Sequence, residues 1–189
     1  VEAYDPQLGA WALVASMSVR RMYHASVALD GKIYAVGGMD EDCETLDTVE
    51  VYDPQANSWQ RVASMPQGRF NHAAAAMGGK IYVTGGECDT FPTDHDENQL
   101  MVNSVYVYDP QANTWAQLAS MDTARRNQAS AAVGGKLYVF GGVNSGERLS
   151  TAEVYDPASD SWAQVKNLAS VRSDAAVSYT HLRAHETDR

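Results

Sequence analysis

One phrase returns four times along this 189-residue chain: a Tyr-Asp-Pro triplet, followed five residues after the proline by a tryptophan. The successive aspartates are 48, 56 and 47 residues apart. A period of this size indicates a repeat architecture, in which each unit packs against the next. The four aspartates are Asp5, Asp53, Asp109 and Asp156.

Other features keep the same period. A Met or Leu follows each tryptophan by six residues, and an arginine follows four residues later. An Ala-rich run, a Gly-Lys turn and an Ile/Leu-Tyr stretch ending in two glycines come next. The arginines are Arg21, Arg69, Arg125 and Arg172, and the glycine pairs are Gly37-Gly38, Gly85-Gly86 and Gly141-Gly142.

Each unit is predicted to form four short strands. The first is the Ala-rich run at 25–29, 73–77 and 129–133, and the second ends in the paired glycines. The third, such as 48–52, leads into the Asp-Pro turn, and the fourth carries the tryptophan. No segment shows a sustained helical period, so the pattern predicts an all-β meander. We expect the glycine pairs to allow positive φ or close backbone approach near a crowded axis.

Together these features resemble the kelch repeat, in register over residues 1–177. The resemblance implies a β-propeller of about six blades, each blade a four-stranded sheet. It also implies the structural motif residues, which are Arg21, Gly37, Gly38, Trp59, Arg69, Gly85, Gly86, Trp115, Arg125, Gly141, Gly142 and Trp162.

The expected fold is a kelch-type propeller fragment with three complete blades, at 21–65, 69–121 and 125–168. Residues 1–17 and 172–177 would be parts of two further blades, and a missing N-terminal region is expected. Residues 178–189 lose the strand alternation and are predicted to be a non-native tail, similar to translated linker sequence. A natural terminal tail is the alternative. An arc of this kind should leave two apolar blade faces open.

The composition limits the partners. The net charge is −10, which disfavours nucleic acid and anionic membranes, because both repel an acidic surface. The sequence contains no run of 18 or more apolar residues, so it predicts no transmembrane helix. The chain has two cysteines, Cys43 and Cys88, and no glycosylation sequon. These facts favour a reducing, cytoplasmic location.

No arrangement of nucleophile, base and acid stands out, so we predict a binding module that is not an enzyme and uses no cofactor or metal. His24 and His72 share one repeat slot, where Gln128 stands in the third unit, which favours a structural role. A metal site at Cys88, His95 and nearby carboxylates lacks the usual ligand spacing. Redox sensing by the cysteines, and an oxidase or epimerase built on the propeller, are the weaker alternatives.

The recurrent arginines allow two interpretations. They could bind an anion, or each could use its guanidinium fork to bond backbone carbonyls between blades. Recurrence in every unit favours the structural role.

A recognition face is predicted where the sequence varies beside this fixed frame. In a four-stranded meander, the 2–3 and 4–1 connections emerge on one face, and these segments differ among units in length and content. Their acidic residues are either solvated surface or a rim for a basic or mixed partner, with Phe91 as a possible anchor. The predicted face contains Tyr23, Asp40, Glu41, Asp42, Phe70, Asn71, Phe91, Asp94, Asp96, Glu97, Arg126, Asn127, Asn144 and Arg148.

The units are most similar to those of BTB-kelch proteins. That resemblance implies a propeller that holds a protein substrate for a cullin-3 ubiquitin ligase, with cullin-3 bound by a BTB region outside this chain. An actin-associated or scaffolding kelch protein is the alternative, because the fold alone does not set the function.

Overall fold

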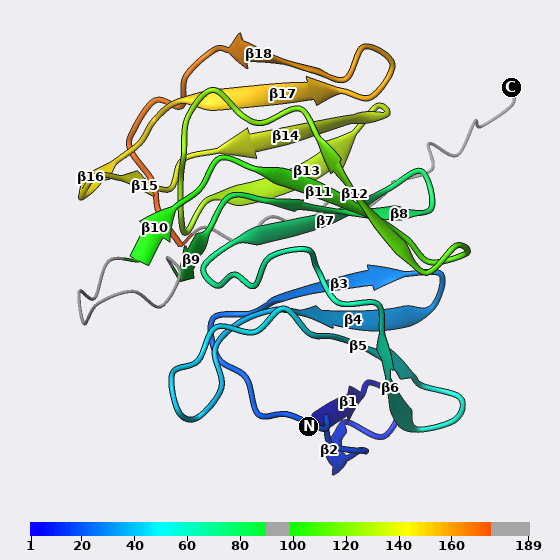
Figure 1. Cartoon of the computed structure of the whole chain (residues 1–189). Coiled ribbons are helices and arrows are strands. Elements are labelled where there is room, and N and C mark those ends of the chain that lie inside the picture. Colours follow the sequence, from blue (N-terminus) through cyan, green and yellow to red (C-terminus); the bar gives the residue numbers. More distant parts are fainter. Residues whose placement is uncertain (90–98, 175–189) are drawn as a thin grey trace, which may run out of the picture.

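The computed structural model describes residues 1–89 and 99–174 (Figure 1). Within these residues the chain forms three four-stranded antiparallel sheets, which confirms the predicted all-β propeller fragment. No helix in the described part is long and apolar enough to cross a membrane. The sheets comprise β3 (Ala25–Leu29), β4 (Lys32–Val36), β5 (Val49–Asp53) and β6 (Ser58–Val62); β7 (Ala73–Met77), β8 (Lys80–Thr84), β11 (Val105–Asp109) and β12 (Thr114–Leu118); and β13 (Ala129–Val133), β14 (Lys136–Phe140), β17 (Ala152–Asp156) and β18 (Ser161–Val165).

Three two-stranded ribbons complete the described strands. They are β1 (Glu2–Asp5) with β2 (Ala10–Leu13), β9 (Glu87–Asp89) with β10 (Gln99–Met101), and β15 (Val143–Asn144) with β16 (Glu147–Arg148). The last two ribbons lie in the connections between the second and third strands of their sheets. The variable connections therefore carry local structure of their own.

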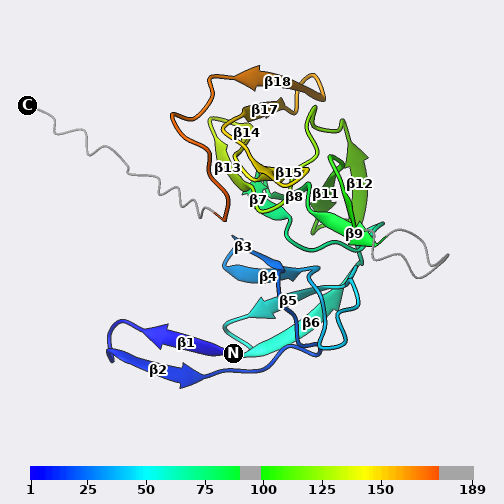
Figure 2. The same ribbon diagram turned by 90° about the vertical axis from the view of Figure 1, so that its left-hand side faces the viewer.

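The sheets are stacked like blades around a common centre. In every blade the strands pair in sequence order, and the first strand of the middle blade, β7, contacts the first strands of both neighbours, β3 and β13. Figure 2 shows these strands innermost and the tryptophan-bearing β6, β12 and β18 at the periphery. The small side chains of the first strands suit this narrow inner position.

The paired glycines lie where the backbone approaches another segment closely: Gly37 and Gly85 face the next blade, and Gly38 and Gly86 face the start of their own blade. Gly38 has φ of +98° and Gly86 has φ of +96°. A Cβ on Gly86 would lie 2.6 Å from the carbonyl oxygen of Phe70. The Gly86 N–H donates across the blade junction to the Arg125 carbonyl at 2.9 Å. Both expected reasons for glycine, positive φ and close backbone approach, are confirmed.

A second set of inter-blade bonds lies at the periphery. Trp115 Nε1 donates to the Ala63 carbonyl of the preceding blade at 2.8 Å, while Asn113 Oδ1 accepts from the Ala63 N–H at 2.9 Å. Asn113 Oδ1 also accepts from the Tyr108 hydroxyl at 2.8 Å. Asn57 with Trp59, and Asp160 with Trp162, repeat this arrangement. Sequence reasoning missed the Asn/Asp position, although it stands two residues before Trp in all three units.

Apolar packing between blades decides what is buried. Ile81 and Leu137 are fully buried against the preceding blade, whereas Ile33 in the equivalent position is 42% exposed. On the side of Ile33 the described residues provide only the β1–β2 hairpin, whose Trp11 is 67% exposed. The same sequence position is therefore core or surface according to its neighbour.

The buried His72 predicts a pH dependence of stability. Burial, followed by the nearby charges of Arg69 and His24, lowers the pKa of His72 to about 3 from the usual 6.5. In the unfolded chain the His72 imidazole binds a proton below about pH 6.5, whereas in the folded chain it stays neutral down to about pH 3. Acidification between these values therefore favours unfolding. We expect the free energy of unfolding to fall by up to about 1.4 kcal/mol per pH unit across this interval.

His72→Gln is the matched variant, because Gln128 fills the same slot and donates to the Thr84 carbonyl at 2.6 Å. Urea melts of both proteins at pH 7.5, 5.5 and 4.5 measure how much unfolding free energy each loses on acidification. The contribution of the carboxylates is the same in both proteins and cancels in the comparison. The variant should lose less stability on acidification. Equal losses would show that His72 does not carry the effect.

Candidate protein-interaction face

The 2–3 and 4–1 connections gather on one side of the molecule, at the left in Figure 1 and facing the viewer in Figure 2. The short 1–2 and 3–4 turns lie at the opposite end. We call the first side the loop face. Beneath it lie the recurrent arginines Arg21, Arg69 and Arg125 with their hydrogen-bond partners, which we call the frame.

Arg125 is fully buried and uses its guanidinium as a fork. Its Nη1 donates to the carbonyls of Gly141 at 2.8 Å and Thr151 at 3.2 Å. Its Nη2 bonds Glu153 Oε1 at 2.5 Å, and Arg21 makes the equivalent contacts with Gly37, Thr48 and Glu50. Every one of these acceptors lies in the arginine's own blade. The expectation that the fork would bond carbonyls between blades was therefore wrong; the junction is crossed instead by the arginine's carbonyl, which accepts from a glycine N–H.

The carboxylates in this frame were not singled out from the sequence. Glu50 and Glu153 are about 1% exposed or less, in the middle of apolar third strands. Burial alone would raise the pKa of Glu50, but the Ser18 N–H and Arg21 outweigh it and hold that pKa below its usual value. A Glu recurring inside an otherwise apolar strand, opposite a recurrent Arg, is the signal that could have found them.

The second blade departs from this pattern. Tyr106 replaces the carboxylate, and the Arg69 guanidinium lies 4.6 Å from the centre of its ring, a cation–π contact. Arg69 still donates to the carbonyls of Gly85 and Ser104. Burial lowers the pKa of Arg69 to about 10, so it remains charged at neutral pH.

The 4–1 connections place one residue of each unit close to the axis. Tyr23 is 59% exposed, whereas Asn71 and Asn127 in the same slot are half-buried. Phe70, predicted as part of the face, is only 3% exposed, so it supports the face from below and does not present its ring to a partner. Its position next to Asn71 in sequence could not reveal this, because the side chains of successive residues point in different directions.

Arg126 joins two blades across the loop face. Its Nη1 bonds Glu87 Oε1 at 2.6 Å, and Asn71 Nδ2 donates to Glu87 Oε2 at 2.9 Å. Glu87 is nearly buried, while the Arg126 side chain is 36% exposed. The pair thus fixes an arginine in position with part of its side chain open to solvent.

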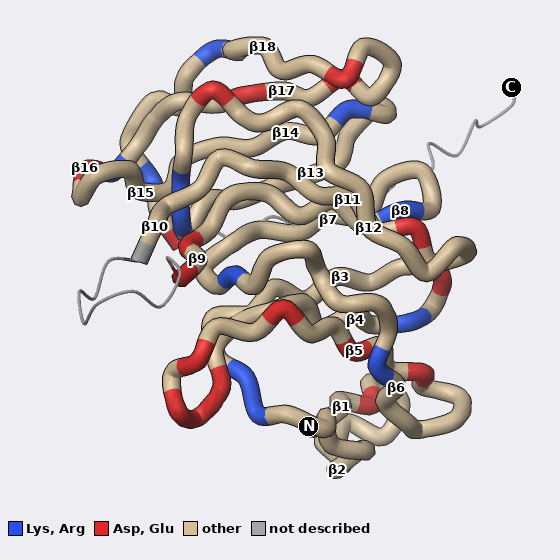
Figure 3. The backbone as a smooth tube through the Cα atoms, in the orientation of Figure 1, with Lys and Arg blue, Asp and Glu red and all other residues tan. Residues whose placement is uncertain are grey.

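The first 2–3 connection forms what we call the acidic turn, consisting of Asp40, Glu41, Asp42 and Glu44. Asp40 Oδ1 closes it by accepting the N–H groups of Asp42 at 3.0 Å and Glu44 at 2.9 Å. Glu41 and Asp42 are exposed, and Glu41 has an exposed partner in Arg20. Figure 3 shows this turn as the red loop beside the Arg20–Arg21 segment.

The second 2–3 connection begins with β9 and ends with β10. Cys88 is buried there; its Sγ lies 3.2 Å from Gln67 Nε2, and burial is the main cause that raises its pKa. Cys43, in contrast, is exposed in the acidic turn. Phe91, Asp94, His95, Asp96 and Glu97 lie outside the described residues, so their predicted roles stay predictions.

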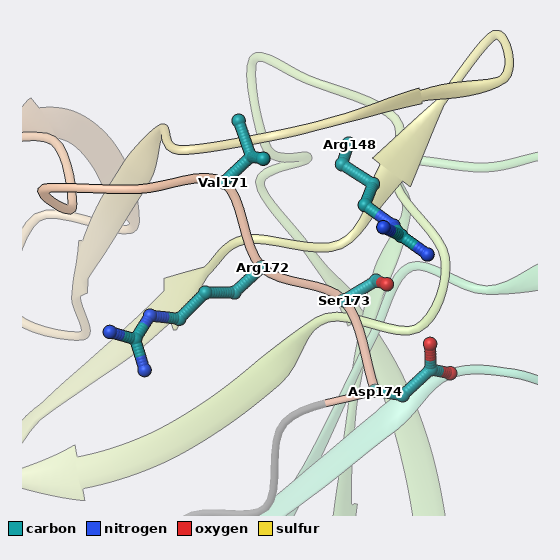
Figure 4. A pocket seen from close by; sticks show the side chains of 5 residues that line it. All are labelled: Arg148, Val171, Arg172, Ser173 and Asp174. Atoms are coloured by element: carbon teal, nitrogen blue, oxygen red, sulfur yellow. The ribbon is translucent and has the colours of Figure 1, made fainter.

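The third 2–3 connection presents Asn144, half-buried, and Arg148, exposed. Arg148 borders a hollow of about 430 Å³ with Val171, Arg172, Ser173 and Asp174. In Figure 4 the Arg172 guanidinium points away from Arg148. Arg172 is also exposed, unlike Arg21, Arg69 and Arg125, and the end of the first strand expected to begin over 172–177 lies outside the described residues.

In the described part of the chain, the loop face presents side chains on a structured backbone and does not bring a set of reactive groups together. Among residues 1–89 and 99–174, no group of three or more His, Cys, Asp or Glu side chains could hold a metal ion. The described face offers exposed aromatic, arginine and carboxylate side chains and half-buried amides on a structured backbone. Such a surface suits binding of another macromolecule.

Comparisons with known proteins agree with this geometry. The sequence profile of the KLHDC2/KLHL20/DRC7 Kelch-repeats domain matches residues 10–180. Kelch-like protein 24a of Danio rerio is 51% identical over 74% of this chain and 22% of its own length. Kelch repeat and BTB domain-containing protein 12 of Danio rerio is 31% identical over 76% of the chain and 15% of its own length.

Two further matches extend the comparison. Alpha-scruin of Limulus polyphemus is 28% identical over 80% of this chain and 17% of its own length. The solved structure of YjhT has a TM-score of 0.71 at 20% identity, over 87% of this chain and 57% of that one, which is a likeness of fold. The matches to Kelch-like protein 24a, alpha-scruin and Kelch repeat and BTB domain-containing protein 12 thus span between 15% and 22% of the length of those proteins.

Proposed function

This chain belongs to the kelch-repeat family, and from that premise we propose that its propeller holds protein substrates for a cullin-3 ubiquitin ligase. That the module binds protein follows from the family. The more specific role is supported by the identity of 51% with Kelch-like protein 24a and by the match to a protein named for a BTB domain beside its kelch repeats. A BTB region elsewhere in the full-length protein would bind cullin-3, and the complex would work in the cytoplasm.

The observation that carries the proposal is the contrast between frame and face. Arg21 and Arg125 make the same buried fork in their blades, while the position two residues later differs: it holds exposed Tyr23 in one blade and half-buried Asn127 in the other. A constant frame with a variable exposed surface is the arrangement expected of a module that selects partners. The acidic composition keeps nucleic acid and anionic membranes as disfavoured partners.

An actin-associated or scaffolding role is the second candidate. The match to alpha-scruin covers 80% of this chain, somewhat more than the 74% covered by Kelch-like protein 24a. The repeats alone do not distinguish the two roles, because both use the same fold.

The test is made on the full-length protein. Wild type and two variants are expressed with an affinity tag, and cullin-3 and ubiquitinated substrates are quantified after capture. Arg148→Glu changes an exposed side chain of the loop face, and Gln111→Lys changes an exposed one at the opposite end. Cullin-3 should be captured by all three proteins, and Arg148→Glu alone should deplete substrates. Absence of cullin-3, together with co-sedimentation with filamentous actin, would favour the second candidate.

A further inference from the structure

The slot occupied by Tyr23 is held in an unusual backbone conformation. Tyr23, Asn71, Asn127 and Asp174 have φ values of +56°, +54°, +54° and +56°. A ladder of backbone bonds connects them from blade to blade: Asn71 N–H to Tyr23 O at 3.0 Å, Asn127 N–H to Asn71 O at 2.9 Å, and Asp174 N–H to Asn127 O at 2.9 Å. The fold therefore imposes the left-handed region on whichever residue stands in this slot.

Tyrosine is the exception among these residues. Asn and Asp tolerate the left-handed region, whereas a bulky side chain there is an outlier that costs free energy. The Tyr23 ring does not recover that cost by packing, because the residue is 59% exposed. The slot is also partly open where a described blade adjoins it, since Asn71 and Asn127 are half-buried there.

The surroundings of Tyr23 combine apolar and acidic surface. Met22 is 39% exposed and is joined by backbone bonds of 2.9 Å to Met39, which leads into the acidic turn. A hollow of about 320 Å³ lies beside them, lined by Arg20, Arg21, Met22, Met39, Asp40 and Glu41. Of these two arginines, Arg21 is buried and paired with Glu50, and Arg20 is paired with Glu41. The exposed carboxylates of Asp42 and Glu44 keep this edge of the face negative.

We propose that Tyr23 is the aromatic anchor for a protein segment that carries an apolar side chain flanked by Lys or Arg. The apolar side chain packs on the Tyr23 ring and Met22, and the basic flanks face the acidic turn. Residues that the fold holds in a strained backbone conformation cluster at functional positions, and tyrosine is enriched among the residues that contribute most to binding energy at interfaces. Complementary charge at the edge selects the partner and speeds its association. This inference rests on the proposed function and specifies its partner.

Tyr23→Asn separates strain from binding, because the chain itself places Asn in this slot twice. We expect the melting temperature of the full chain to rise by about 2–4 °C while binding of basic-flanked apolar peptides weakens about 10–30-fold. Asn127→Tyr is the reverse control and should lower the melting temperature. A lower melting temperature for Tyr23→Asn, or unchanged peptide binding, would overturn the proposal.

The partner chemistry is tested on an array of 12-residue peptides in four classes. They carry an apolar residue flanked by Lys/Arg, the same residue flanked by Asp/Glu, the same residue flanked by Ser/Gly, or the Lys/Arg flanks without it. The first class should bind best and weaken as salt increases. Glu41→Lys with Asp42→Lys and Glu44→Lys should abolish this preference; Asp40 is kept because its carboxylate closes the turn.

Gln55→Lys with Gln111→Lys adds positive charge at the opposite end and should leave the preference intact. Preference for another class would overturn the inference while leaving the proposed function standing. Binding of no class at all would also overturn it, and the cullin-3 capture on the full-length protein then judges the proposed function separately.

Discussion

Replacing Arg125 with methionine should lower the free energy of unfolding by about 3–5 kcal/mol. The substitution leaves Glu153, which is 0% exposed, as an uncompensated charge in the interior. It also removes the donor that serves the carbonyls of Gly141 and Thr151. Urea unfolding followed by tryptophan fluorescence measures the change.

Two companion variants identify the cause. Adding Glu153→Leu to Arg125→Met removes the stranded carboxylate and should restore part of the loss. Glu153→Tyr alone copies the second blade, where Tyr106 lies beside Arg69, and should cost less than Arg125→Met. A loss under about 1 kcal/mol for Arg125→Met would contradict the role assigned to the fork.

Gly86→Ala should destabilise the chain by about 3 kcal/mol or more, the sum of backbone strain and a steric clash. Its φ of +96° is rarely adopted by residues with a side chain, and the new Cβ would lie 2.6 Å from the Phe70 carbonyl oxygen and 2.7 Å from His72 Cβ. Relief would require the second strand to move away from the connection that begins the same blade. Calorimetry and urea melts both report this loss.

Gly79→Ala is the matched control. Gly79 also has positive φ, +74°, but a Cβ there would meet nothing within 4 Å. Its cost should therefore be limited to the conformational preference, about 1–2 kcal/mol. Equal effects at Gly86 and Gly79 would show that the close approach between segments contributes nothing.

Much of the strand pattern could be predicted because it is local. The first strands at 25–29, 73–77 and 129–133 were placed to the residue, and the third strand expected at 48–52 is observed one residue later, at Val49–Asp53. Strand ends are marked by the residue types close to them: small and β-branched residues inside the strand, and turn formers just outside it. Because the units repeat, the strand assignment made for one unit also applied to the other two blades.

The candidate site was predicted less completely, because exposure depends on neighbours distant in sequence. Tyr23 and Phe70 were both assigned to the face, yet Tyr23 is exposed and Phe70 is buried. Whether a side chain in these connections points to solvent is decided by the adjoining blade, which begins about fifty residues away. The roles of the other face residues stay predictions.

Residue type and spacing were enough to establish the repeat, the all-β blades and the positions of glycine, arginine and tryptophan. How those positions are used depends on the folded chain. The tertiary structure placed the arginine fork within its own blade, assigned Glu50 and Glu153 as its buried partners, and held Tyr23 exposed at a positive φ. These features arise where segments distant in sequence meet, and their energies come from burial and close contact that no short stretch of sequence contains.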